Sequence, residues 1–347
     1  LSLGKGIRMT RKRVEENERI KRRYLQYLRE AKRSDMATVD KAADAILRFE
    51  RSTGFKPFKR FHIEQAVRFK AQLSDARNEK TGKPLSKSTI DSTLRTVKAF
   101  ALWLAGQQGY RSKISYSDAE YFNLNAKDSR IAHTERETPY PTLEQCRHAF
   151  AQMPSATPLQ RRDKALFAFL MLTGARDGAV ASLRLKHIDL AQGCIYQDAR
   201  DVKTKFAKTF ITTFFPVDAD YLQCFRDWVD YLRKDQLFGP GDALFPKPLM
   251  GLNDGGFACL GLSRDTYGNA GKIRDVIKTA FKDAGLPSYG PHSFRKTLGI
   301  LANEFCKTPE QFKAWSMNLG HENIATTLSA YCPVSPTRQA ELIRGMG

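Results

Sequence analysis

The regular spacing of apolar residues stops between about Arg111 and Pro141 and is present on either side of this stretch. The stretch collects Ser, Asp and Asn and also contains Pro139, a composition typical of linkers. A chain of 347 residues is long enough for two ordinary domains, each with its own core. We therefore predict two folding units joined by a linker over residues 113–141.

A surplus of positive charge limits the choice of partner. The formal net charge is +20 at pH 7. Such a surplus repels itself unless a polyanion neutralises it, so nucleic acid is the leading candidate. On charge alone, a ribosomal-type or merely basic protein remains the alternative.

Features that the sequence lacks exclude several classes of protein. No run approaches the ~20 consecutive apolar residues of a membrane span, and the basic start has no apolar stretch behind it, so we expect no membrane contact and a cytoplasmic location. The six cysteines lie far apart without a C-x-x-C pair, so we interpret them as reduced packing residues and expect no metal. The glycine-rich stretch from Gly239 to Gly271 has no phosphate-loop pattern, so we expect a long loop and no nucleotide cofactor.

Residues 1–35 are interpreted as a basic amino-terminal arm that ends in a short helix. Lys and Arg outnumber Asp and Glu here, and Arg11, Lys12 and Arg13 stand together. Such charges can follow DNA phosphates without reading sequence. They also fit a solvated helix face, and this alternative stays open.

Residues 36–112 are predicted to form a small all-helical domain. Apolar side chains recur at helical spacing in three segments, and Ser86 is a plausible N-cap of the third. The outer faces are basic, as in a module that grips a duplex, and the candidate DNA contacts are Lys87, Arg95 and Lys98. The apolar positions are Val39, Ala42, Ala43, Ile46 and Leu47; Ile63, Val67, Phe69 and Leu73; and Ile90, Leu94, Val97, Phe100, Leu102 and Trp103.

A second domain is predicted from Thr142, which starts a helix with Gln145 in the capping-box position. Helices alternate there with one short strand pair, whose β-branched and aromatic content suits extended structure. The predicted helices cover residues 162–172, 179–185, 221–236 and 273–283, and the strands cover residues 194–196 and 210–217.

Four segments of the second domain carry residues suited to chemistry on a phosphate. Arg176 follows a glycine break, which directs a planar cation out of a helix junction. His292 and Arg295 are three residues apart after Pro291, so they share one face of a helix near its positive end. Each of these three residues could also be an ordinary surface residue without a role in chemistry.

The other two segments hold lysines and a tyrosine. Lys203, Lys205 and Lys208 lie in the turn between the predicted strands, where a lysine can reach a cleft as proton donor or remain solvated. His321 is followed by Tyr331, whose phenol is a candidate nucleophile near cationic groups, although a lone tyrosine is more often a core residue.

Taken in chain order, these segments resemble the catalytic signature of the tyrosine recombinase or phage integrase family. The matching pieces are T-G-A-R at residues 173–176, P-H-S-F-R-K-T at 291–297, and L-G-H-E-N-I-A-T-T at 319–327 with its downstream tyrosine. The resemblance implies a mainly α fold with a small β-sheet (α+β). It consists of an amino-terminal helical core-binding (SAM-like) domain and a catalytic domain over residues 142–331, followed by a tail over residues 332–347.

The resemblance also implies a role for each residue. Tyr331 would attack the phosphodiester and form a 3′-phosphotyrosine, and Arg176 and Arg295 would clamp the non-bridging oxygens. His321 would add a third donor and His292 would act as general base. Lys205 would protonate the leaving oxygen, with Lys203 as the alternative. Lys203 and Lys208 are further assigned to DNA contact. No cofactor is implied, because one phosphate ester is exchanged for another.

The implied partners are double-stranded DNA recombination sites and further copies of the chain, which would form a tetramer on DNA. The tail would dock on a neighbouring protomer, and accessory proteins that set direction are compatible with this assembly. We expect the chain in the bacterial cytosol or nucleoid, as part of a mobile element.

Departures from the family pattern and three alternatives remain, and the stretch from Gly239 to Gly271 enlarges the gap before His292. Ala179 stands where the family often has an acidic residue, so Asp177 is the candidate substitute, and the interval from His321 to Tyr331 is one residue longer than usual. The alternatives are a type IB topoisomerase, a non-catalytic DNA-binding protein and a metal-dependent nuclease or transposase.

Overall fold

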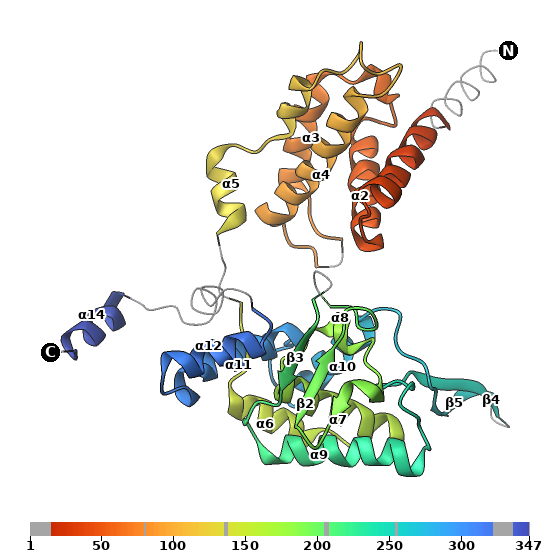
Figure 1. The fold of residues 1–347 in the computed structure, drawn as a ribbon. Coiled ribbons are helices and arrows are strands. Elements are labelled where there is room, and N and C mark those ends of the chain that lie inside the picture. Colours follow the sequence, from red (N-terminus) through yellow and green to blue (C-terminus); the bar gives the residue numbers. More distant parts are fainter. Residues whose placement is uncertain are drawn as a thin grey trace. The chain divides into compact units, whose positions relative to one another are not determined.

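The computed structural model describes residues 15–79, 81–134, 138–204, 208–253, 256–321 and 336–346. The chain divides into two compact units, Leu1–Arg136 and Glu137–Gly347. Both are mainly helical, and the second also holds small antiparallel sheets (Figure 1). The predicted fold class, mainly α with a small β-sheet, is therefore confirmed. No helix in the described part of the chain has the length and apolar character needed to cross a membrane.

The first unit is built from helices with short connections. The three helices predicted over residues 36–112 are present, and Ser86 caps the third by accepting a hydrogen bond from the backbone N–H of Thr89 (3.1 Å). The helical elements are residues 15–26 continuing into η1 (Tyr27–Ala31), α2 (Met36–Ser52), η2 (Phe58–Arg60), α3 (Ile63–Asp75), α4 (Lys87–Ala105), η3 (Ser117–Phe122) and α5 (Ala126–His133).

The core of this unit includes residues from both ends of its sequence. Tyr24, in the segment interpreted as an arm, is buried with its ring centroid 5.0 Å from that of Phe100. Phe122, in the segment interpreted as linker, is buried with its ring 5.4 Å from that of Phe49. Val67 was predicted on the apolar face of its helix, but it is exposed, since the buried stripe of α3 runs through Ala66, Phe69 and Leu73.

The second unit contains more helices and, among its described residues, five short strands. Its elements are α6 (Leu143–Gln152), α7 (Pro158–Thr173), α8 (Asp177–Val180), η4 (Leu185–His187), β1 (Ile188–Asp189), β2 (Cys194–Gln197), β3 (Phe210–Thr213), α9 (Ala219–Asp230), η6 (Tyr231–Asp235), β4 (Pro248–Asn253), β5 (Gly256–Leu262), α10 (Gly271–Asp283), α11 (Pro291–Phe305), α12 (Pro309–Asn318) and α14 (Pro336–Arg344).

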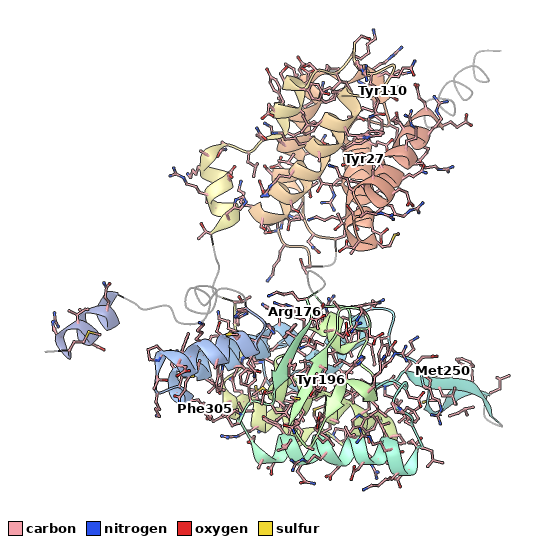
Figure 2. All side chains as sticks on the ribbon, in the orientation of Figure 1. Tyr27, Tyr110, Arg176, Tyr196, Met250 and Phe305 are labelled. Carbon is pink, nitrogen blue, oxygen red and sulfur yellow. The ribbon has the colours of Figure 1, made fainter. Side chains whose placement is uncertain are left out.

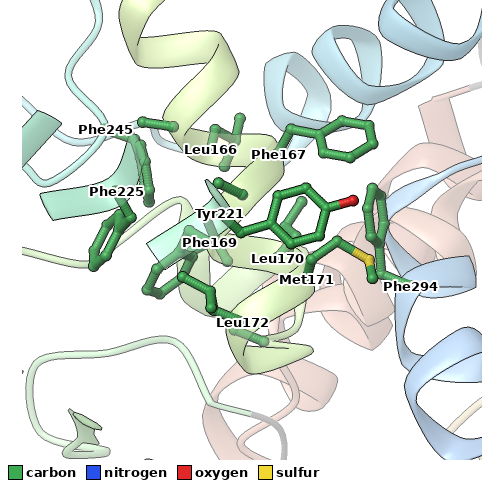
Figure 3. Close-up of a cluster of buried hydrophobic side chains, with 14 of the residues drawn as sticks. Leu166, Phe167, Phe169, Leu170, Met171, Leu172, Tyr221, Phe225, Phe245 and Phe294 are labelled. Atoms are coloured by element: carbon green, nitrogen blue, oxygen red, sulfur yellow. The ribbon is translucent and has the colours of Figure 1, made fainter. Parts of the chain in front are cut away.

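Helix α7 lies at the centre of this unit and is buried on all sides along its second half. Phe167 packs edge-on against Phe294 of α11, with ring centroids 4.8 Å apart, while Phe169 contacts Phe225 of α9 at 5.1 Å (Figure 3). Aromatic pairs of this kind stabilise a core beyond the area they bury. The packing fixes the carboxyl end of α7, where the T-G-A-R segment begins.

Side chains at the helix starts explain where several helices begin. The predicted capping box of Thr142 and Gln145 is present at α6, and equivalent boxes start α7 and α12. Helix α11 begins at Pro291, in the first-turn position that proline favours. The buried hydroxyl of Thr297 on α11 donates to the carbonyl of Pro141 (2.6 Å), which ties the entry of the chain into this unit to α11.

The strands form two separate sheets. The predicted pair is present as β2 and β3, antiparallel with Tyr196 opposite Ile211, and β1 adds a third strand. The prediction of a long loop over residues 239–271 is wrong in part, because β4 and β5 form an antiparallel hairpin within this range. Glycines and an irregularity between Leu249 and Met250 interrupt the alternation that would have predicted these strands.

The cysteines only partly match their interpretation as packing residues. Cys146 and Cys194 are buried and Cys224 and Cys306 are partly buried, but Cys259 on β5 is exposed. None of these five forms a disulfide with another described cysteine. Cys332 lies outside the described residues.

Candidate active site

The end of α7 presents the first predicted site residue. Gly174 adopts a left-handed conformation (φ 56°), which terminates the helix and turns the chain toward Arg176. Arg176 is half-buried and precedes the short helix α8 (Figure 2). A Cβ on Gly174 would lie 2.9 Å from Cδ2 of Leu319 and 3.0 Å from Cδ1 of Leu298, so glycine allows α7, α11 and the end of α12 to approach closely.

The first two turns of α11 hold His292 and Arg295. Three-residue spacing puts them on the same side of the helix, as predicted. They differ in environment, since His292 is exposed whereas Arg295 is only 3% exposed. A buried arginine requires partners for its N–H groups.

Hydrogen bonds to Gly174, Leu319 and His321 hold the Arg295 guanidinium. Nη1 donates to the carbonyl of Gly174 (2.6 Å), and Nη2 donates to the carbonyl of Leu319 (2.6 Å) and to Nε2 of His321 (3.1 Å). This side chain therefore joins the ends of α7 and α12 to α11. It brings together three of the four segments that the sequence singled out.

The position of His321 depends on the turn that follows α12. Gly320 has φ 73° and packs against Phe210, whose ring atoms would lie 2.9 Å from an added Cβ. Asn318 fastens the same turn to β3, because its amide donates to the carbonyl of Thr213 (2.8 Å) and accepts from the backbone N–H of Thr213 (2.7 Å). The sequence analysis did not identify Asn318 or Gly320 as positioning residues.

Burial and nearby positive charge keep His321 neutral. The ring is 9% exposed, and burial followed by the charges of Arg295, Arg176, His292 and Lys208 lowers the pKa of His321 to about 4. Arginine has no acceptor, so Nε2 of His321 must accept the bond from Arg295, and the proton of the neutral ring lies on Nδ1. The same charges show that these residues lie within electrostatic range of one another.

The predicted lysines differ in their surroundings. Lys203 is exposed, and its Nζ donates to the carbonyl of Gly268 (2.8 Å), while its backbone N–H donates to Ser182 Oγ (2.9 Å). Lys208 is half-buried and is one of the charges that act on His321. Lys205 and Tyr331 lie outside the described residues.

Asp177, the candidate substitute for the family's acidic residue, pairs with a basic residue of α10. Its carboxylate pairs with the guanidinium of Arg274 on α10 and also accepts a hydrogen bond from the backbone N–H of Gly178 (2.8 Å). The paired Asp177 thus links α8 to α10, a role that the sequence analysis did not foresee.

The three cations of α4 predicted to contact DNA pair with carboxylates of the first unit. Lys87 lies 3.0 Å from Asp128, and Lys98 lies 2.8 Å from Glu120. Arg95 pairs with Asp91 on its own helix (3.0 Å) and also contacts His133 (3.0 Å). Arg11, Lys12 and Arg13 lie outside the described residues.

One family model matches this chain, and solved structures share its fold. A model of the phage integrase family matches residues 142–338. A lambda integrase dimer bound to a COC′ core site has a similar structure, with a TM-score of 0.61 and 13% identity, over 90% of this chain and 94% of that chain. The Tn1549 transposon integrase in complex with transposon right-end DNA gives a TM-score of 0.58 and 19% identity, over 94% and 99% of the two chains. No curated protein sequence matches significantly.

Proposed function

This chain belongs to the phage integrase family, and we propose that it is a site-specific recombinase that cuts and rejoins DNA through a 3′-phosphotyrosine at Tyr331. Membership of the family implies DNA cleavage and rejoining as the general activity. The roles of the individual residues in cleavage and rejoining are likewise proposed.

The main support for this proposal is the fixed position of the Arg295 guanidinium. This group is fixed from the protein side by the carbonyls of Gly174 and Leu319. Cations held in this way stabilise the charge that builds on phosphoryl oxygens without reorganising during the reaction. Arg176, in range of the same centre, supplies the second cation.

The two proton transfers and a further hydrogen bond to the phosphate are assigned to three other residues. The tyrosine phenol has an ordinary pKa of about 10, so it needs a base as it attacks, and we assign this role to His292, whose side chain is exposed. Neutral His321 can offer its Nδ1–H to a phosphoryl oxygen while Nε2 remains bonded to Arg295. Lys205 gives a proton to the leaving 5′ oxygen, with Lys203 and Lys208 as the alternatives.

The reaction conserves one phosphate ester at each step. The phenolic oxygen of Tyr331 bonds to phosphorus, the bond from phosphorus to the 5′ oxygen breaks, and that oxygen leaves as a hydroxyl. A 5′-hydroxyl of the partner strand then attacks phosphorus, and the tyrosine recovers its proton as it leaves. Rejoining therefore needs no ATP.

Exchange between two duplexes requires four such centres, so we propose a tetramer on DNA. The lambda and Tn1549 integrases are similar in fold and were solved bound to DNA, which supports duplex DNA as the partner of this chain. We further propose that the tail over residues 332–347, which contains α14 with exposed Ile343, docks on a neighbouring protomer. Accessory proteins that set direction and a bacterial cytosolic location, as part of a mobile element, fit this activity.

A trap for the covalent intermediate tests the proposal. The full chain is incubated with a library of duplexes that carry a randomised core and a nick, so that the cleaved fragment diffuses away and rejoining stops. A denaturing gel should show protein joined to DNA, and sequencing of the trapped DNA then gives the preferred site.

Two controls make the outcome decisive. Tyr331→Phe removes the nucleophilic oxygen and should abolish the covalent band while duplex binding persists. EDTA should leave the band unchanged. A band that persists in Tyr331→Phe, or that requires a divalent metal, would overturn the proposal.

A further inference from the structure

The β4–β5 hairpin gathers exposed apolar side chains on one of its faces. Leu252 pairs with Phe257 across the strands, and Met250 pairs with Cys259 two positions further along. Cross-strand partners point to the same side of a sheet, and so do residues two apart. Leu252 is 79% exposed and Phe257 is 71% exposed, and the other two are exposed as well. These four residues are called the hairpin face.

The opposite side of the hairpin carries Leu249 and Leu260, which are 46% and 51% exposed and thus less exposed than Leu252 and Phe257. Gly251 and Ala258 pair there, and the Leu260 side chain lies across Gly251, so close that its Cδ1 would be 2.5 Å from an added Cβ. The base of the hairpin is anchored, because Leu262 is buried and the backbone N–H of Ser263 donates to the carbonyl of Lys247 (2.9 Å). Figure 1 shows the two strands extending from the helices of the second unit, and Figure 2 labels Met250 on them.

Charge argues against DNA as the occupant of the hairpin face. In a chain of net charge +20, residues 248–262 contain no lysine or arginine and a single charged residue, Asp254. Contact with DNA phosphates relies on lysine and arginine. An apolar surface without charge fits a protein partner.

We propose that the hairpin face packs against the same face of a second copy of this chain on DNA. Among the described residues, no other segment of similar length exposes as many large apolar side chains, so the best complement for the hairpin is another hairpin. A two-fold contact of this kind uses the same surface on both copies, so it gives a closed dimer and not an open filament. This inference depends on the proposed function in one respect, namely that DNA binding brings the copies together.

The size of the hairpin face explains why DNA is needed. Four such side chains supply only about half of the ~800 Å² per partner that stable interfaces bury. Two free copies also repel one another through their net charge of +20. Neutralisation by DNA removes this repulsion, so we expect monomers in solution and contact between hairpins on DNA.

Cys259 provides a direct test, since two packed hairpin faces bring two copies of this thiol together. The full chain is treated with a short bismaleimide crosslinker, with and without plasmid DNA, and the products are separated on a denaturing gel. A crosslinked dimer should form on DNA and disappear in Cys259→Ser. The double variant Leu252→Ser with Phe257→Ser should lower the yield about tenfold, the effect expected when two central apolar contacts are lost.

Matched controls separate the possible failures. Leu237→Ser removes an equally exposed apolar side chain outside the hairpin and should leave the yield unchanged. Fluorescence anisotropy with a short labelled duplex measures DNA binding by one copy, and thermal melting verifies folding. If the short duplex is not bound, the proposed function fails. If it is bound but no dimer forms, or the dimer persists in Cys259→Ser, the hairpin contact is refuted.

Discussion

The guanidinium of Arg295 donates a hydrogen bond to Nε2 of His321 over 3.1 Å, which connects α11 to the residue that follows the turn after α12. Both side chains are buried, and neither can move without disturbing the other. Substitutions at the two positions should therefore be non-additive.

Arg295→Lys should reduce formation of the covalent intermediate by about 10²–10³-fold, because a single ammonium cannot replace the planar fork of donors. It should also lower the free energy of unfolding by about 1–3 kcal/mol, because a buried acceptor loses its partner. Single-turnover cleavage and urea unfolding measure the two effects. Cleavage near the wild-type rate would contradict the assignment.

Stability should decrease as the pH falls from about 6.5 to about 4, the window between the unfolded and folded pKa values of His321. The folded pKa is the lower one, so the unfolded chain binds the extra proton in this window, while stability is fully retained above it. His321→Gln keeps an acceptor for Arg295 but does not titrate. Urea unfolding at pH 7 and pH 5 should therefore show a smaller loss in this variant, and equal losses would refute the prediction.

Gly174→Ala should destabilise the second unit more than Gly285→Ala does. Both glycines have positive φ, so alanine costs about 1–2 kcal/mol of backbone strain at either position. Only at Gly174 would the new methyl group also press on buried Leu298 and Leu319, which adds about 1–3 kcal/mol. Thermal unfolding of the two variants gives the difference, and equal values would mean that the contact relaxes freely.

Glu120→Gln should strengthen duplex binding if Lys98 contacts DNA, because it frees this lysine from a carboxylate 2.8 Å away. The slope of log affinity against log salt concentration should become steeper by about one. Glu64→Gln removes the same charge from α3, where the partner is His62, and serves as the control. The same change in slope in both variants would indicate a general charge effect.

Lys205→Ala should slow cleavage by about 10²–10⁴-fold if this lysine protonates the leaving oxygen. A substrate with sulfur at the bridging 5′ position needs no such proton and should restore the rate. Lys203→Ala and Lys208→Ala are measured in parallel with both substrates. The variant that sulfur rescues identifies the proton donor, so rescue of either one in place of Lys205→Ala would reassign the role.

Local signals in the sequence predicted much of the fold. Ser86 and Thr142 start helices because each side chain accepts a hydrogen bond from a backbone N–H of the first turn. The segment around Tyr24 was harder to interpret, because its many basic residues hide the few apolar side chains that enter the core. The hairpin of β4 and β5 was missed, since its glycines are also typical of loops.

The site was predictable as a set of segments but not as an arrangement. The family signature indicated Arg295 and His321, yet nothing in the sequence states that Arg295 binds the carbonyl of Gly174, 121 positions away. Backbone carbonyls have no sequence signature. The pairing of Lys98 with Glu120 is likewise a tertiary contact. The position of Lys98 on an outer helix face therefore did not predict that a carboxylate pairs with it.

The hydroxyl of Thr297 holds the carbonyl of Pro141, and Nζ of Lys296 holds that of Thr138. The chain that enters the second unit is thereby fastened to the helix that carries His292 and Arg295. These two hydrogen bonds give the connecting chain a direct link to α11, in addition to its covalent continuation into α6. A pull on the connecting chain is thus transmitted to the alignment of these two side chains.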